Sequence, residues 1–114
     1  MLGISMNKSP ELDLEIRVIA SCVRIPATVP TVINYLTFDH FASRTLALTF
    51  AEIKSRHGFG KGIDHTVIKS TVLKQLNPEK RQDASELFEV IRYEDLDDLN
   101  IENACVLLND WLRV

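Results

Sequence analysis

Cysteine is scarce in this chain, because only Cys22 and Cys105 occur among its 114 residues. Two thiols cannot form the several bridges of a small secreted disulfide scaffold, and both lie in strongly apolar stretches. We therefore expect buried, reduced thiols and a cytoplasmic protein. A chain of this length can bury a sufficient core as a single domain, spanning residues 1–114, without disulfides or metal.

Long apolar runs are missing as well. The longest uncharged run, residues 25–38, is too short to cross a bilayer and contains Pro26 and Pro30. The first eight residues lack the apolar centre of a secretory signal. The sequence therefore predicts no membrane segment.

The sequence also lacks the common motifs of metal and nucleophilic chemistry. It has no HExxH or CxxC spacing, and His40, His57 and His65 are not spaced as metal ligands. The glycine-rich run 58–62 offers bare amides to an anion, but it lacks the spacing and the Lys-Ser/Thr ending of a phosphate-binding loop. A flexible turn is the simpler interpretation, so we predict no enzyme activity, no cofactor and no metal.

Charge is distributed unevenly, although the net charge is only −3. From Arg44 to Arg81 eight cations stand against three acids, whereas residues 83–102 contain eight acids against Arg92 alone. This asymmetry is typical of a basic binding face beside an acidic flank, although two solvated surfaces explain it equally well. The acidic flank has a second interpretation as a docking surface for a basic partner protein.

Apolar residues recur at helical spacing through most of the chain. The sequence predicts a helix that starts at Pro10 with Ser9 as its N-cap, and a last helix capped by Asn100. Between them we expect helices over 38–47 (capped by Thr37), 50–57, 65–76 and 78–93, while 31–38 fits either a strand or a helix and leans to a helix. The predicted fold is therefore all-α, a compact bundle of five or six short helices.

The apolar stripes of these helices predict the core. The first helix has two stripes, so we expect it to be buried on most sides. Trp111, beside Leu107, Leu108 and Leu112, belongs either to the core or to a dimer seam. The predicted core positions are Leu12, Leu14, Ile16, Val18, Ile19, Cys22, Val23, Phe38, Phe41 or Ala42, Leu46, Phe50, Ile53, Ala84, Leu87, Phe88, Ile91, Ile101, Ala104 or Cys105, Leu108 and Trp111.

Residues 49–76 have the outline of a helix-turn-helix. Thr49 and Glu52 suit a capping box, Gly58 suits a left-handed helix end, and Asp64 suits the N-cap of the second helix. In this motif the second helix enters the major groove of DNA, although the turn here is longer than the usual three or four residues. The second helix has an apolar side with Val67 or Ile68, Val72 and Leu76, and an outer side with His65, Thr66, Lys69, Ser70 and Lys74.

The same segment resembles the C-terminal DNA-binding domain of the bacterial replication initiator DnaA over about thirty residues. The matching features, in order, are Glu52-Ile53, Gly58, Asp64-His65-Thr66 and Val67. The resemblance implies that His65 and Thr66 approach bases. It also implies that Asp64 caps the helix and touches DNA, and that Lys61 lies near a phosphate. The longer turn and Lys54, where that family prefers a small residue, are departures from the pattern.

These features predict a small helix-turn-helix protein that binds double-stranded DNA and regulates transcription or replication. We expect it to come from a phage or another mobile element, and it could bind DNA as a homodimer. Its cations would contact phosphates, which fix register without reading sequence. The alternative is a non-enzymatic protein-interaction module, an anti-activator or inhibitor that uses its acidic C-terminal helices. The expected DNA-binding residues are Lys54, Arg56, Lys61, Asp64, His65, Thr66, Lys69, Ser70 and Lys74.

Overall fold

Helix α1 (Pro10–Arg24) lies at the centre of the computed structural model, which describes residues 10–112 and the side chains of residues 11–110. Its two predicted stripes are both covered, and Ile16, Val18 and Ile19 have no exposed surface. Helices α2, α3, α5 and α6 all contact it. The predicted first helix is confirmed, while its predicted cap, Ser9, lies outside the described residues.

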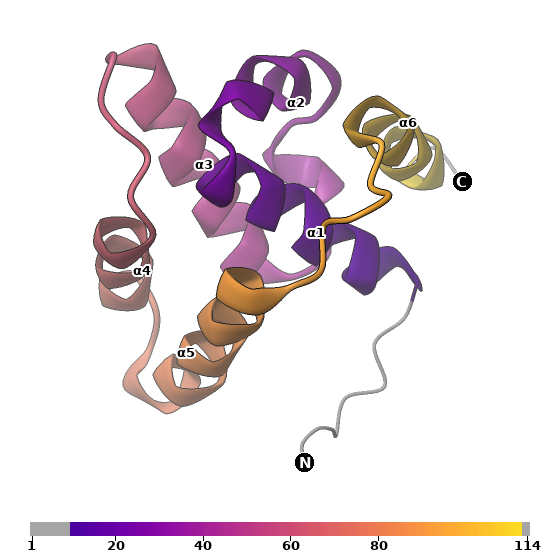
Figure 1. The fold of residues 1–114 in the computed structure, drawn as a ribbon. Helices are drawn as coiled ribbons and strands as arrows, with labels where there is room; N and C mark the ends of the chain where they lie inside the picture. Colours follow the sequence, from indigo (N-terminus) through magenta and orange to yellow (C-terminus); the bar gives the residue numbers. More distant parts are fainter. Residues whose placement is uncertain (1–9, 113–114) are drawn as a thin grey trace.

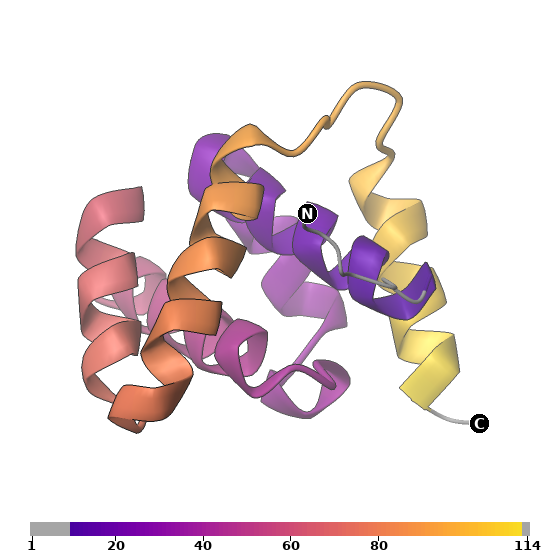
Figure 2. The same cartoon turned by 90° about the horizontal axis from the view of Figure 1, so that it is seen from below.

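Six α-helices and two short 3₁₀ turns make up the described chain, which contains no strand, so the all-α prediction is confirmed. The α4–α5 hairpin lies on one side of α1 and α6 on the other (Figure 1; Figure 2). The radius of gyration is 13.2 Å, close to the value of about 13 Å typical of a single domain of about 100 residues. After α1 the elements are η1 (Pro26–Thr28), α2 (Val29–Tyr35), η2 (Phe38–His40), α3 (Arg44–Gly58), α4 (His65–Lys74), α5 (Pro78–Tyr93) and α6 (Ile101–Leu112).

Helix α3 is one continuous helix, so the two predicted helices over 38–47 and 50–57 are wrong. Its N-cap is Ser43, whose Oγ accepts a hydrogen bond from the Leu46 backbone amide at 3.3 Å. Thr49, the predicted cap, is fully buried within the helix and donates its hydroxyl to the Thr45 carbonyl oxygen at 2.7 Å. A threonine that satisfies its hydroxyl on the preceding turn can remain inside a helix.

The end of α3 also differs from the prediction. Glu52 forms an ion pair with Arg56 at 2.9 Å and makes no capping box with Thr49. The glycine with a left-handed backbone is Gly60, at φ 70°, instead of the predicted Gly58. Gly58 is still part of the helix, because the backbone adopts the left-handed turn two residues later.

A buried carboxylate connects α1 to the start of α3. Glu15 is only 2% exposed, and its two oxygens accept hydrogen bonds from the backbone amides of Ala42 at 3.2 Å and Ser43 at 3.4 Å. Burial raises the pKa of Glu15 above its ordinary value of 4.5, while the two amide hydrogen bonds act in the opposite direction. The chain entering α3 is thus held against the central helix.

The remaining core follows the predicted stripes, except that Phe38, predicted to face inward, is 43% exposed. Phe88 and Ile91 of α5 are fully buried, and the rings of Phe41 and Phe50 pack with centroids 5.0 Å apart. Both cysteines are free and fully buried, as predicted. Burial is the main cause that raises the pKa of Cys22 to about 12 and that of Cys105 to about 11.

The described helices were also compared with the dimensions of a bilayer. None of them alone is long and apolar enough to cross a membrane. The segments 11–24 and 26–35 reach the required length and composition only when taken together, across a bend of 114°.

Candidate functional site

Asp64 begins helix α4, as the sequence predicted. Its Oδ1 accepts a hydrogen bond from the Val67 backbone amide at 3.0 Å, and its own backbone is extended. Ile68 and Val72 are fully buried, whereas Val67 is 42% exposed. Of the two alternatives for the apolar side, the one with Ile68 is therefore correct.

The side chain of His65 lies against α5. Its Nε2 is 2.9 Å from the Phe88 carbonyl oxygen, its Nδ1 is 3.3 Å from a guanidinium nitrogen of Arg92, and its ring meets the Phe88 ring edge-on. A guanidinium only donates hydrogen bonds, so Nδ1 is the acceptor here and the proton lies on Nε2. His65 thus joins α4 to α5 with both ring nitrogens.

The other predicted DNA-contacting residues differ in their solvent exposure. Arg56 donates to the Glu52 carboxylate at 2.9 Å and to the Gly62 carbonyl oxygen at 3.4 Å. Contact of the exposed residues with DNA stays a prediction. The exposed members of the predicted set are Lys54, Lys61, Asp64, Thr66, Ser70 and Lys74, and the half-buried members are Arg56, His65 and Lys69.

Two arginines of α1 hold the acidic connection between α5 and α6. Arg17 donates to the carbonyl oxygens of Asp95 and Asp97, each at 3.2 Å. Arg24 donates to the carbonyl oxygen of Glu94. The acidic segment is therefore fixed to the central helix through its backbone, a role that the charge count alone did not predict.

Helix α6 exposes two adjacent apolar side chains. Val106 is 42% exposed and Leu107 is 47% exposed, while Leu108 is buried. Asn100 caps the helix as predicted, since its Oδ1 accepts a hydrogen bond from the Asn103 amide at 2.9 Å. The side chain of Trp111, predicted for the core or a dimer seam, lies outside the described residues.

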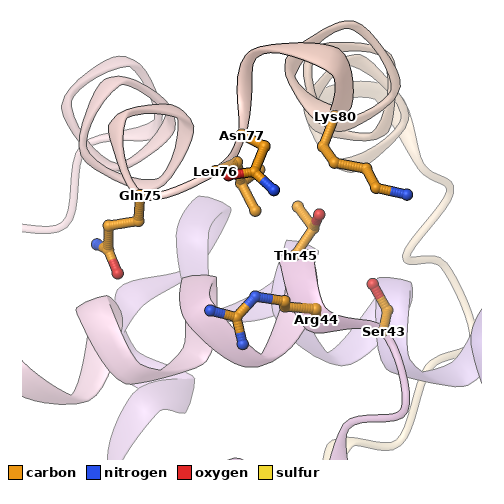
Figure 3. Close-up of a pocket in the computed structure, with 7 residues that line it drawn as sticks. All are labelled: Ser43, Arg44, Thr45, Gln75, Leu76, Asn77 and Lys80. Carbon is orange, nitrogen blue, oxygen red and sulfur yellow. The ribbon is translucent and has the colours of Figure 1, made fainter.

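A pocket of about 360 Å³ lies between the start of α3 and the turn from α4 to α5 (Figure 3). Sequence reasoning missed it, because Arg44 and Lys80 are far apart in the chain and were counted only within a long basic segment. Arg81 fixes the turn by donating to the carbonyl oxygens of Leu73 at 2.9 Å and Leu76 at 3.2 Å. The lining residues are Ser43, Arg44, Thr45, Gln75, Leu76, Asn77 and Lys80.

The described side chains contain no group of three or more His, Cys, Asp or Glu residues placed to hold a metal ion. The pocket itself is lined by hydroxyls, amides and cations and by the apolar side chain of Leu76, and no acid lines it. Its chemistry is therefore that of a donor-rich cavity.

Comparison with protein families identifies the domain. Residues 7–110 match the family model of the DnaB-like helicase N terminal domain, so the match includes α1 to α5 and most of α6. The chain belongs to this helicase-domain family. No curated protein and no solved structure matches the chain.

Membership in the DnaB-like family corrects two predictions. The resemblance to the DnaA DNA-binding domain is wrong, and so is the function of a DNA-binding regulator that was built on it. Of the matched features, Glu52-Ile53 and Gly58 lie within α3, and Asp64 is an N-cap of a kind that begins many helices. None of them is specific to DNA binding. The family match does not support the anti-activator alternative, and it leaves the helix-turn-helix unconfirmed.

Proposed function

We propose that this domain serves DNA replication together with a replicative helicase activity, in the same chain or in a partner. The supporting observation is the family match over residues 7–110, which takes in nearly the whole described fold. The resemblance to the DnaA domain covered only about thirty residues, whereas the family match extends over residues 7–110. The role also agrees with the cytoplasmic location expected from cysteine usage.

We infer that the domain contributes contacts and does not catalyse a reaction. Strongly shifted pKa values often mark catalytic groups. Here the groups with clearly shifted pKa values are Glu15, Cys22 and Cys105, and all three are buried in the packing between helices. Their shifts come mainly from that burial, which is a structural cause.

The proposal includes self-association through α6. Val106 and Leu107 form an adjacent apolar pair on one helix, each more than two-fifths exposed. Burial of such a pair against a second copy removes apolar surface from water at about 25 cal/mol per Å². A symmetric pair of α6 helices would cover both copies of this surface at once.

The helicase-related role is tested in cells that carry the gene. In-frame removal of codons 10–112 should lower the rate of DNA synthesis, measured by incorporation of labelled thymidine shortly after the intact copy is switched off. A matched strain with His57→Ala, a substitution at an exposed position, should synthesise DNA normally. Normal synthesis in the deletion strain would contradict the proposal.

Self-association is tested by sedimentation of the purified chain over a range of concentrations. The variant with Val106→Glu and Leu107→Glu should sediment as a monomer at concentrations where the parent associates. Val67→Glu is the matched control, because Val67 on α4 is 42% exposed, as Val106 is. If the parent and the α6 variant sediment with equal masses, Val106 and Leu107 do not form the self-association surface.

A further inference from the structure

We propose that the pocket between the start of α3 and the α4–α5 turn binds a phosphate group, carried by a nucleotide or by a nucleic-acid strand. The site is independent of the helicase-related role proposed above. It rests on the charges, the hydrogen-bond donors and the size of the cavity.

Two cations supply the charge of this phosphate pocket. Arg44 is the first residue of α3 and Lys80 lies in the first turn of α5, so they line the cavity from two different helices, and their side chains extend toward opposite sides of it (Figure 3). No acid lines the cavity, and among the described side chains neither cation has an ion pair. Uncompensated cations around one cavity favour an anion, and Arg suits phosphate oxygens because it can donate two parallel hydrogen bonds.

Neutral donors complete the lining. The Ser43 Oγ already accepts a hydrogen bond from the Leu46 amide, so its own hydrogen is available to a ligand. The Thr45 hydroxyl and the Asn77 side-chain amide make no hydrogen bond with another described residue. With the two cations, these groups line the cavity with several hydrogen-bond donors, which suit the oxygens of a phosphate.

The helix ends strengthen the same preference. Asn77 is the N-cap of α5, and its side chain makes no capping hydrogen bond. Pro78 has no amide hydrogen and the Lys80 amide donates to the Asn77 carbonyl oxygen at 2.9 Å, so the Glu79 amide is the donor of this first turn that stays available. The starts of α3 and α5 both carry the positive end of a helix dipole. The opposing carbonyls at the end of α4 are bonded by Arg81, which offsets their negative potential.

The size of the pocket limits the ligand. Its volume of about 360 Å³ is at the lower end of the range of about 300–1,000 Å³ for small-molecule sites. A free phosphate ion fills only part of this space, whereas a nucleotide, free or within a strand, has a size in keeping with it. Both sources present the same chemical group to the two cations.

The proposal is tested by titrating the isotope-labelled 114-residue chain while backbone amide resonances are recorded. The probes are inorganic pyrophosphate, ADP and a short single-stranded oligothymidylate, each against sodium sulfate as the reference anion. We expect saturable shifts at residues 43–45, 75–77 and 80. The double variant Arg44→Gln/Lys80→Gln should bind about tenfold more weakly or worse, since each charged hydrogen bond contributes about that factor or more.

A matched variant controls for net charge. Lys54→Gln/Lys61→Gln removes the same charge from exposed positions outside the pocket, so it should bind pyrophosphate and ADP as the parent does. Arg44→Lys keeps the charge and should weaken binding less than Arg44→Gln. Circular dichroism of each variant shows whether it is folded. If the double variant is unfolded, the comparison of Arg44→Gln with Arg44→Lys tests the proposal in its place.

Each outcome has one interpretation. Binding of pyrophosphate and ADP indicates a nucleotide pocket, and binding of the oligothymidylate alone indicates a strand-binding pocket. The proposal is overturned if no probe gives saturable shifts at the pocket, if sulfate binds equally well, or if the Lys54/Lys61 control loses as much affinity as the Arg44/Lys80 variant.

Discussion

His65 donates a hydrogen bond from Nε2 to the carbonyl oxygen of Phe88 at 2.9 Å. The two rings also meet edge-on, with centroids 5.7 Å apart. His65, the first residue of α4, thus stabilises the packing of α4 on α5. The sequence had instead predicted that its side chain approaches DNA bases. Its surroundings explain its placement without any ligand.

Replacement of His65 by Ala should lower the free energy of unfolding by about 1–3 kcal/mol, because it removes a part-buried hydrogen bond and an aromatic contact. Urea unfolding followed by circular dichroism measures the change. His57→Ala is the matched control: His57 is exposed, so its loss should change stability by about 0.5 kcal/mol or less. If the two variants are equally stable, His65 does not stabilise the packing of α4 on α5.

The features that the sequence predicted correctly are those that depend on residues close together in the chain. The bounds of α5, the Asp64 cap and the buried stripes of α1 all follow from local capping and from helical spacing. The predictions were wrong where packing between distant segments of the chain determines the structure. Thr49 is a good cap residue, yet burial of α3 keeps it inside the helix, and Glu15 holds the chain before α3 from a different helix.

The candidate sites were harder to predict than the fold for the same reason. Arg44 and Lys80 approach one cavity only because α3 packs beside the α4–α5 turn. His65 and Phe88 meet only because α4 and α5 form a hairpin. Spacing along the chain contains no direct signal for either arrangement, so a local motif was given too much weight.

Glu15 should make stability depend on pH in a direction opposite to that of most carboxylates. Its folded-state pKa is raised above 4.5, chiefly by burial, so the folded state binds the proton more tightly than the unfolded state does. Stability from this group is therefore greatest below pH 4.5 and falls as the pH rises through the folded-state pKa. Unfolding free energies measured from pH 4.5 to 7 should show this fall.

The substitution Glu15→Gln isolates this effect. Subtracting the unfolding free energy of the variant from that of the parent cancels the other titrating groups, and the difference should decrease as the pH rises. A constant difference for Glu15→Gln would show that its folded and unfolded pKa values are equal.

The two thiols should be inert in the native protein. Cys22 has no exposed surface, and burial raises its pKa to about 12, so almost no thiolate is present at pH 8. Ellman's reagent should react at the rate of unfolding in native buffer and rapidly in concentrated urea. The variant Lys54→Cys supplies an exposed reference thiol on α3 that should react at once. Rapid reaction of the parent chain would mean that the α1–α6 packing opens readily.

Asp98 is the one described residue other than glycine with a positive φ, 64°. It lies in the α5–α6 connection, next to Asp97, whose carbonyl oxygen accepts a hydrogen bond from Arg17. A β-branched residue is strained in the left-handed region, at a cost of about 1–2 kcal/mol, whereas Asn and Gly adopt it readily. Asp98→Val should therefore lower the unfolding free energy by about that amount, and Asp98→Asn should leave it nearly unchanged.

Amide hydrogen exchange places the effect of Asp98→Val within the fold. Exchange should become faster first in the α5–α6 connection, because the strained residue loosens the backbone that Arg17 holds against α1. Exchange in the α4–α5 hairpin should change only as much as global stability does. If Val and Asn at position 98 give the same stability and the same exchange, the left-handed backbone there imposes no cost on the folded state.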